Sequence, residues 1–197
     1  DNYEFEAVYA PGAALIPQQP ATGAAEPAAW AKVFVDRAIA EGLLPAELQS
    51  AYDQPITRRE FCLLADALYT KVKGSAAPVD ATVTFTDTTD PAILRMASAK
   101  VVNGVGNELF DPNGQLTREQ AATMLSRLAA ALGKPLTDSA PTFDDNGSVA
   151  GWASAAVGQM QLSGIMSGTG NNQFSPQQSY TREQSVVTIV RMCELLK

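Results

Sequence analysis

Three short stretches of this chain combine residue types that can bind an anion. They occupy residues 56–60, 116–120 and 180–184, and each reads apolar residue, Thr, Arg, charged residue, then Glu or Gln. An Arg guanidinium can form two parallel hydrogen bonds to a carboxylate, and the unpaired N–H groups at a helix start also favour an anion. These stretches, called boxes below, therefore predict anion binding through Arg58, Arg118 and Arg182.

The boxes also predict where helices begin. A Thr followed three residues later by Glu or Gln forms a capping box, in which each side chain accepts a hydrogen bond from the other residue's backbone. Thr57, Thr117 and Thr181 are therefore expected to be helix caps. The Arg then falls at the first helical position, where the helix dipole disfavours a cation. Three such arginines in register indicate that they have a purpose other than helix stability.

Composition excludes several classes of function. The chain has 197 residues and a formal net charge of −7, which argues against general binding of nucleic acid or an anionic membrane. It contains no His, so the commonest metal ligand and general base are missing. No apolar run is long enough to span a bilayer. No nucleophile beside a base and no phosphate loop is found, so we expect no catalysis, no metal and no cofactor.

The two cysteines, Cys62 and Cys193, lie in apolar helical patterns and are expected to be small buried side chains. The sequence leaves open whether they pair with each other.

Helical patterns occupy most of the chain after residue 27. Residues 1–27 are rich in Ala, Pro and Gly and predict a linker with a short strand near 3–9, joining this module to an upstream domain of the same protein. A first helix is expected over residues 30–40. The helix after the first box should end at Gly74, and Asp90-Pro91 should begin another.

The same helix–loop–helix scheme occurs three times. The Thr of the box recurs at intervals of 60 and 64 residues. Such repetition predicts three units that share one core: residues 28–77, 82–137 and 140–197. Packing alone leaves two arrangements open, a closed pseudo-threefold ring and a short open stack.

The second and third units resemble the S-layer homology repeat. Both have a Phe-x-Asp opening, at Phe85 and Phe143, and the third adds the Trp152-Ala153 pair. Both have a Gly-x-Gly loop followed by Phe and Pro, and both continue into the box. The glycines of these loops are Gly104, Gly106, Gly168 and Gly170.

The resemblance implies a mainly all-α fold of three repeats in a pseudo-trimer, with the first helices of the units in a central bundle. It also implies non-covalent anchoring of an exported bacterial protein to the cell wall. The implied ligand is an anionic secondary cell-wall polysaccharide, including one that bears a pyruvate ketal. The grooves between neighbouring repeats would bind it, with the box Arg at the centre and the Gly loops close to the sugar.

Each of these residues has a second interpretation. The arginines could form salt bridges between units instead, and Arg59 is expected to be solvated. The glycines could serve turn geometry, and Phe110 and Phe174 are expected to be core plugs. Trp30 and Trp152 could stack on a sugar or be mostly buried. Two further aspartates, Asp87 and Asp145, are expected to cap or brace the first helices.

The first unit departs from the pattern. It lacks both the Phe-x-Asp opening and the Gly-x-Gly loop, so we expect its groove to be lost and Arg58 to be structural. The second and third boxes end in Gln120 and Gln184 rather than Glu. Gln still completes a capping box, so these helix starts should survive.

The sequence thus predicts a secreted, cell-surface, carbohydrate-binding module of tandem repeats without catalytic activity. The partner is expected to be secondary cell-wall polysaccharide, with neither nucleic acid binding nor membrane insertion. The alternative is a protein-interaction or assembly module that kept the fold and lost the glycan site.

Overall fold

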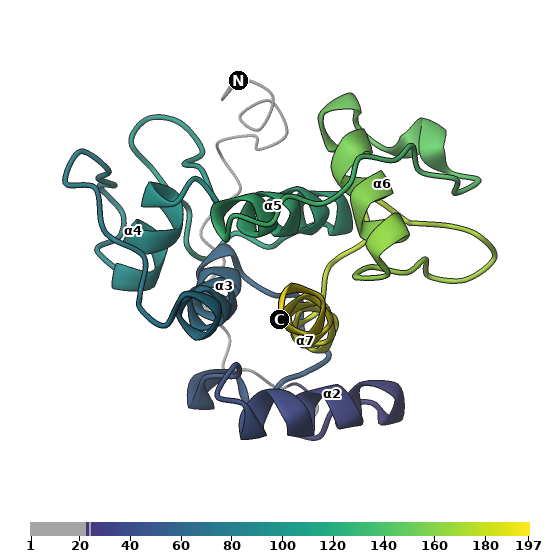
Figure 1. Cartoon of the computed structure of the whole chain (residues 1–197), viewed down its shortest axis with the longest axis horizontal. Coiled ribbons are helices and arrows are strands. Elements are labelled where there is room, and N and C mark those ends of the chain that lie inside the picture. Colours follow the sequence, from purple (N-terminus) through teal and green to yellow (C-terminus); the bar gives the residue numbers. More distant parts are fainter. Residues whose placement is uncertain (1–22, 24) are drawn as a thin grey trace.

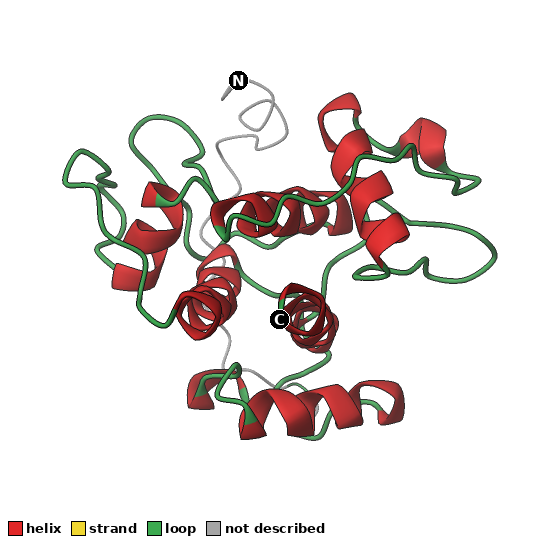
Figure 2. Ribbon diagram, in the orientation of Figure 1, coloured by secondary structure: helices red, strands yellow, loops and turns green. Residues whose placement is uncertain are grey.

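The computed structural model describes residue 23 and residues 25–197, and this part of the chain is helical (Figures 1 and 2). The predicted strand near residues 3–9 and most of the predicted linker lie outside the described residues. Within the described part there are six α-helices and no strand, which confirms the mainly α-helical class. Their bounds are α2 Ala29–Ala40, α3 Arg58–Lys73, α4 Pro91–Ser98, α5 Arg118–Ala131, α6 Ser154–Ser163 and α7 Arg182–Leu196.

The helix ends follow the predicted capping chemistry. Thr57, Thr117 and Thr181 each accept a hydrogen bond from the backbone N–H three residues on, and the Glu or Gln there accepts one from the Thr backbone. Gln therefore completes the box as well as Glu does. Helix α3 ends at Gly74 in the left-handed conformation, and Asp90 caps α4 through the Ala92 N–H at 2.9 Å.

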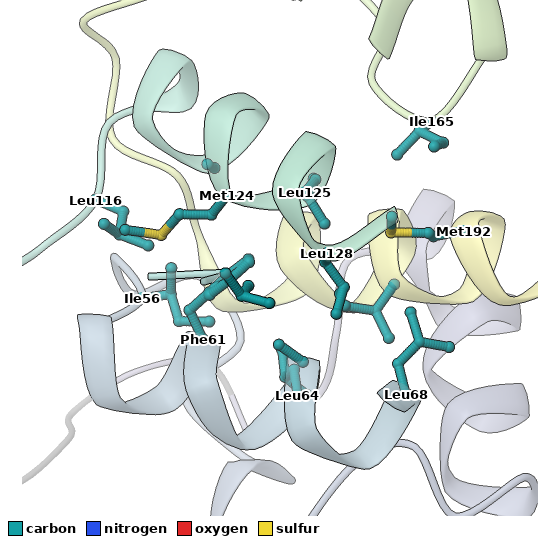
Figure 3. Packing of buried hydrophobic residues seen from close by; sticks show 14 of the residues in the cluster. Ile56, Phe61, Leu64, Leu68, Leu116, Met124, Leu125, Leu128, Ile165 and Met192 are labelled. Atoms are coloured by element: carbon teal, nitrogen blue, oxygen red, sulfur yellow. The ribbon is translucent and has the colours of Figure 1, made fainter. Parts of the chain in front are cut away.

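The helices that follow the boxes occupy the centre of the molecule. Figure 1 shows α3, α5 and α7 inside, with α2, α4 and α6 around them. This corrects the expectation that the first helices of the units form the central bundle. Apolar side chains explain the order, because the post-box helices meet in one buried cluster (Figure 3). Its members there include Phe61, Leu64, Leu68, Met124, Leu125, Leu128 and Met192.

Each outer helix packs against the central helix of the preceding unit. Helix α4 packs on α3, α6 packs on α5, and α2 packs on α7. The last of these contacts joins the third unit back to the first.

A three-way exchange of backbone hydrogen bonds joins the boxes at the centre. The Ile56 N–H donates to the Tyr180 carbonyl, the Tyr180 N–H to the Leu116 carbonyl, and the Leu116 N–H to the Ile56 carbonyl, at 2.8, 3.0 and 3.3 Å. All three side chains are buried. Each unit therefore contacts both others through the residue that precedes its box Thr.

Candidate functional site

The box arginines do not bind the loops of their own units. Arg58 Nε donates to the Phe110 carbonyl at 2.8 Å, and Arg58 Nη2 donates to the Asn103 carbonyl at 2.6 Å. Both carbonyls belong to the Gly-x-Gly loop of the second unit. The Arg of one unit thus holds the loop of the next, and this contact is called a seam below.

The second seam repeats the first. Arg118 Nε donates to the Phe174 carbonyl at 2.8 Å, and Arg118 Nη2 donates to the Ser167 carbonyl at 2.7 Å. The guanidinium also lies over the Phe174 ring, 4.8 Å from its centroid, as that of Arg58 lies over Phe110 at 4.4 Å. Both Phe rings are fully buried, which confirms them as core plugs.

The third seam is different, because its loop belongs to the divergent first unit. Arg182 Nη1 donates to the Ser50 carbonyl, and Arg182 Nη2 forms an ion pair with Glu60 Oε1 at 2.6 Å. Glu60 is the residue that completes the first capping box; its other oxygen accepts from the Thr57 N–H at 3.0 Å. Arg182 is thus the member of the three that forms the inter-unit salt bridge considered from sequence.

These pairings differ from those expected from the sequence, because Arg182 and not Arg58 contacts the unit without a Gly-x-Gly loop. The order of the sequence predicts that Arg118 and Arg182 act with the intact loops that precede them and that Arg58 lies at the lost loop. The structure pairs the intact loops with Arg58 and Arg118, and the divergent segment with Arg182. Sequence order misleads here because the contacts run forward to the next unit.

The N–H groups at the start of the post-box helices are already occupied. In α5, the Arg118 N–H donates to the Gln178 carbonyl at 3.0 Å and the Glu119 N–H to the Pro176 carbonyl at 3.1 Å. The third N–H, from Gln120, donates to the Thr117 hydroxyl. The other two boxes repeat this pattern. The expectation that these helix starts attract an anion directly is therefore wrong, and any ligand must be bound by side chains and loops.

Each loop requires glycine at two positions, for two different structural reasons. Gly106 and Gly170 have φ values of +94° and +118°, which other residues adopt only at a cost. Gly104 and Gly168 are needed for close packing instead. A Cβ atom on Gly104 would lie 2.8 Å from the Leu109 carbonyl oxygen, and one on Gly168 would lie 2.6 Å from that of Gln173.

Two aspartates brace these loops rather than the first helices. Asp87 accepts from the N–H groups of Phe110 and Asp111, and Asp145 accepts from those of Phe174 and Ser175 at 2.8 and 2.7 Å. Burial raises the pKa of Asp145, but the hydrogen bonds from Phe174, Ser175 and its own backbone, together with the charge of Arg118, lower it below the ordinary value. The Phe-x-Asp opening therefore fixes the loop that the neighbouring Arg holds.

The charged residue after each box Arg also reaches the next unit. Glu119 accepts from the Ala150 N–H and Glu183 from the Ala28 N–H, both at 2.9 Å, where the next unit's first helical region begins. Arg59 instead pairs at 2.7 Å with Asp90, the carboxylate that caps α4. Arg59 is thus held in ion pairs with Asp90 and Glu47, and the expectation that it is solvated is wrong.

A groove of about 430 Å³ lies at the Arg118 seam. It is lined by Arg118, by the loop residues Ser167 to Thr169, by α7 side chains that include Gln184 and Arg191, and by Trp30 of α2. Its lining contains two guanidinium groups and no carboxylate, although acidic residues outnumber basic ones in the chain by 21 to 14. Within the described residues, neither Arg118 nor Arg191 forms a salt bridge.

Arg118 keeps one part of its guanidinium unused. Its side chain is only 5% exposed and burial lowers its pKa, yet an Arg stays charged at neutral pH. Nε and Nη2 bind loop carbonyls, whereas Nη1 forms no hydrogen bond within the described part of the chain. Arg58, by contrast, is completely enclosed.

The two tryptophans have different environments. Trp30 is 53% exposed and lines the groove, so the buried alternative is wrong for it. Trp152 is partly buried and packs against the core. Arg191 also lines the groove and was not among the residues predicted from the sequence. The repeat could have indicated it, because Arg191 lies nine residues after Arg182 just as Arg127 lies nine residues after Arg118.

The described residues contain no disulfide, no metal site and no membrane-spanning helix. Cys62 and Cys193 are free and buried, and no group of His, Cys, Asp or Glu there could hold a metal. None of the helices in the described part is long and apolar enough to cross a membrane.

The fold and the seams define a module of helical repeats in which each unit completes its neighbour. Residues 86–122 and 142–184 match the model of the S-layer homology domain. Over these two segments the chain matches the S-layer homology family, as the motifs of the second and third units indicated. The first unit lies outside the matched segments.

Two known enzymes contain similar segments. An endoglucanase of Bacillus sp. (strain KSM-635) is 33% identical over 93 residues, which cover 46% of this chain and 10% of that protein. The exoglucanase XynX of Acetivibrio thermocellus is 26% identical over 171 residues, covering 84% of this chain and 16% of that protein. Both relatives are thus far longer than the segment that they share with this chain.

Proposed function

We propose that this chain is a non-catalytic module that anchors an exported bacterial protein to the cell wall by binding an anionic secondary polysaccharide. The observation that carries the proposal is the groove at the Arg118 seam, where two guanidinium groups line a cleft without a carboxylate. Unpaired cations in a partly buried groove of an acidic protein favour an anionic ligand. A sugar carboxylate, as in a pyruvate ketal, has the matching chemistry.

The family supports the anchoring role. Segments similar to this chain also occur within an endoglucanase and an exoglucanase, and the chain covers only small fractions of those proteins. Their glucanase activities are properties of those longer chains. By analogy, this module would hold a further domain of its own protein at the cell surface.

The predicted unit boundaries, 28–77, 82–137 and 140–197, and a pseudo-threefold arrangement belong to the same proposal. The cyclic hydrogen bonds of Ile56, Leu116 and Tyr180 support it, as do the forward contacts of all three box arginines.

Wall binding tests the proposal. Purified cell walls should sediment the protein, and chemical removal of the secondary polysaccharide should abolish this. Arg118→Gln, alone and with Arg182→Gln, should lower wall binding at least tenfold, because a charged hydrogen bond is lost. Arg95→Gln is the matched control, since Arg95 pairs with Asp66 away from the groove. Undiminished binding in the double variant would refute the proposal.

The second candidate is an assembly module that binds protein. It is favoured by the enclosure of Arg58 and by the pairing of Arg182 with Glu60, since both positions are filled internally. Sedimentation that survives removal of the polysaccharide would support this candidate.

A further inference from the structure

Two positions in the unit that supplies the loop contribute to the charge of each seam. One is the last residue of the box. It is Glu60 at the Arg182 seam and Gln184 at the Arg118 seam. The other lies nine residues after each box Arg and is Ala67, Arg127 or Arg191. These positions distinguish the Arg182 seam from the other two, which both have Gln and Arg there and differ from each other in burial and in the loop residue, Asn103 or Ser167.

The Arg182 seam is neutralised. Glu60 pairs with Arg182 at 2.6 Å, and the side chains are only 15% and 9% exposed. The second position on α3 is Ala67, so no further cation is supplied there. An anion approaching this seam would have to displace a largely buried carboxylate, which is costly.

The Arg58 seam is closed by burial. The Arg58 side chain is 0% exposed and is held by the Phe110 and Asn103 carbonyls. In the amide orientation that satisfies both of its groups, the Asn103 side chain also accepts from Arg127 Nη1 at 3.1 Å. The second cation of this seam is thus hydrogen-bonded to the Asn103 side chain, whereas the Arg118 seam has Ser167 in place of Asn103.

The Arg118 seam keeps both cations at the groove. Arg191 is half-buried; it lies over the Phe34 ring at 5.3 Å and donates weakly to the Ile165 carbonyl at 3.3 Å. These contacts position the guanidinium and leave its charge uncompensated. Gln184 takes the place that Glu60 has at the neutralised seam. Trp30 reaches the same groove from α2, which packs on α7.

We propose that the chain has one glycan site, at the Arg118 seam, in which Arg191 is a second binding cation and Trp30 is the sugar-stacking wall. The inference rests on the proposed function and deepens it. All three units build the site: the second provides Arg118, the third provides the loop and Arg191, and the divergent first unit provides Trp30. The ligand class is an acidic sugar whose carboxylate lies between two guanidinium groups and whose apolar face covers an indole.

Calorimetric titration of the intact chain tests the count and the residues. The probe is a methyl glycoside with a 4,6-linked pyruvate ketal, and its methyl ester is the uncharged control. One equivalent of the acid should bind, and the ester should bind at least tenfold more weakly. Arg191→Gln and Trp30→Ala should each weaken the acid about tenfold, and Arg191→Lys should recover part of the loss.

Matched controls lie on α2 outside the groove. Lys32→Gln removes a positive charge two residues from Trp30, and Val33→Ala trims an exposed apolar side chain. Both should bind the acid as the unchanged chain does. Melting temperatures of Arg191→Gln and Trp30→Ala check that they remain folded.

Two or three equivalents of bound acid would overturn the inference, as would unchanged affinity in both Arg191→Gln and Trp30→Ala. No binding of the acid glycoside would overturn it as well. In each case the proposed function would still stand if cell walls sediment the protein through Arg118.

Discussion

Glu60 and Arg182 form an ion pair at 2.6 Å across the contact between the first and third units. The same Glu60 side chain completes the cap of α3 through its other oxygen. One carboxylate therefore completes a helix cap, joins the first unit to the third and compensates the charge of Arg182, one of the predicted ligand arginines.

Glu60→Gln should lower the free energy of unfolding by about 1–2 kcal/mol, because Gln keeps the cap but loses a largely buried charge partner. Gln120 and Gln184 show that the cap itself tolerates this change. Chemical denaturation followed by circular dichroism measures the effect. Glu47→Gln is the control, since its pair with Arg59 is exposed and the cost should stay within about 0.5 kcal/mol. Equal costs for the two variants would contradict the role of Glu60.

Arg58→Met should cost about 2–4 kcal/mol of stability, because two loop carbonyls lose their donor inside the protein. Wall binding, measured at a temperature where the variant is folded, should stay unchanged. Thermal unfolding and wall sedimentation on one preparation separate the two effects. A folded variant that no longer binds walls would show that Arg58 contacts the ligand.

Gly104→Ala should destabilise the chain by about 1–3 kcal/mol, since the new Cβ would lie 2.8 Å from the Leu109 carbonyl oxygen and 2.9 Å from a Phe85 ring carbon. Gly147→Ala is the matched control because a Cβ there meets nothing within 4 Å. Its effect should remain within about 0.5 kcal/mol. Similar denaturation midpoints for both variants would show that the loop adjusts without strain.

Asp145 should make the free energy of unfolding depend on pH in the acidic range. Its pKa is lower in the folded chain, so its contribution is complete above the unfolded pKa of about 4 and is lost as the pH falls through the folded value. Asp145→Asn should cost about 1 kcal/mol at pH 7 and much less near pH 2. Unfolding free energies from pH 7 to pH 2 check this. A constant difference between the two proteins would contradict it.

Local chemistry explains why much of the fold could be predicted from the sequence. Capping residues such as Thr57, the Asp90-Pro91 start and Gly74 act within one helix turn, so their signals are complete in a short stretch. The buried Phe110 and Phe174 followed from their places in the repeated loop.

The partners across the seams could not be predicted, because they depend on which unit follows which in space. The sequence contained Arg182, Glu60 and Ser50, yet nothing in their spacing joins residues 122 and 132 positions apart. The role of Asp145 could not be predicted for the same reason, since the N–H groups that donate to its carboxylate lie 29 and 30 residues away. Trp30 lies at the groove only because α2 packs on the last helix.

The cyclic contacts of Ile56, Leu116 and Tyr180 also remove a problem that linear repeat proteins share. An open array has two end units with an exposed apolar face, and it needs special terminal repeats to cover them. Here α2 of the first unit packs on α7 of the third, so the first and last of the described units contact each other. The divergent first unit therefore contacts both other units although it lacks their Gly-x-Gly loop, and its Trp30 lines the groove at the Arg118 seam.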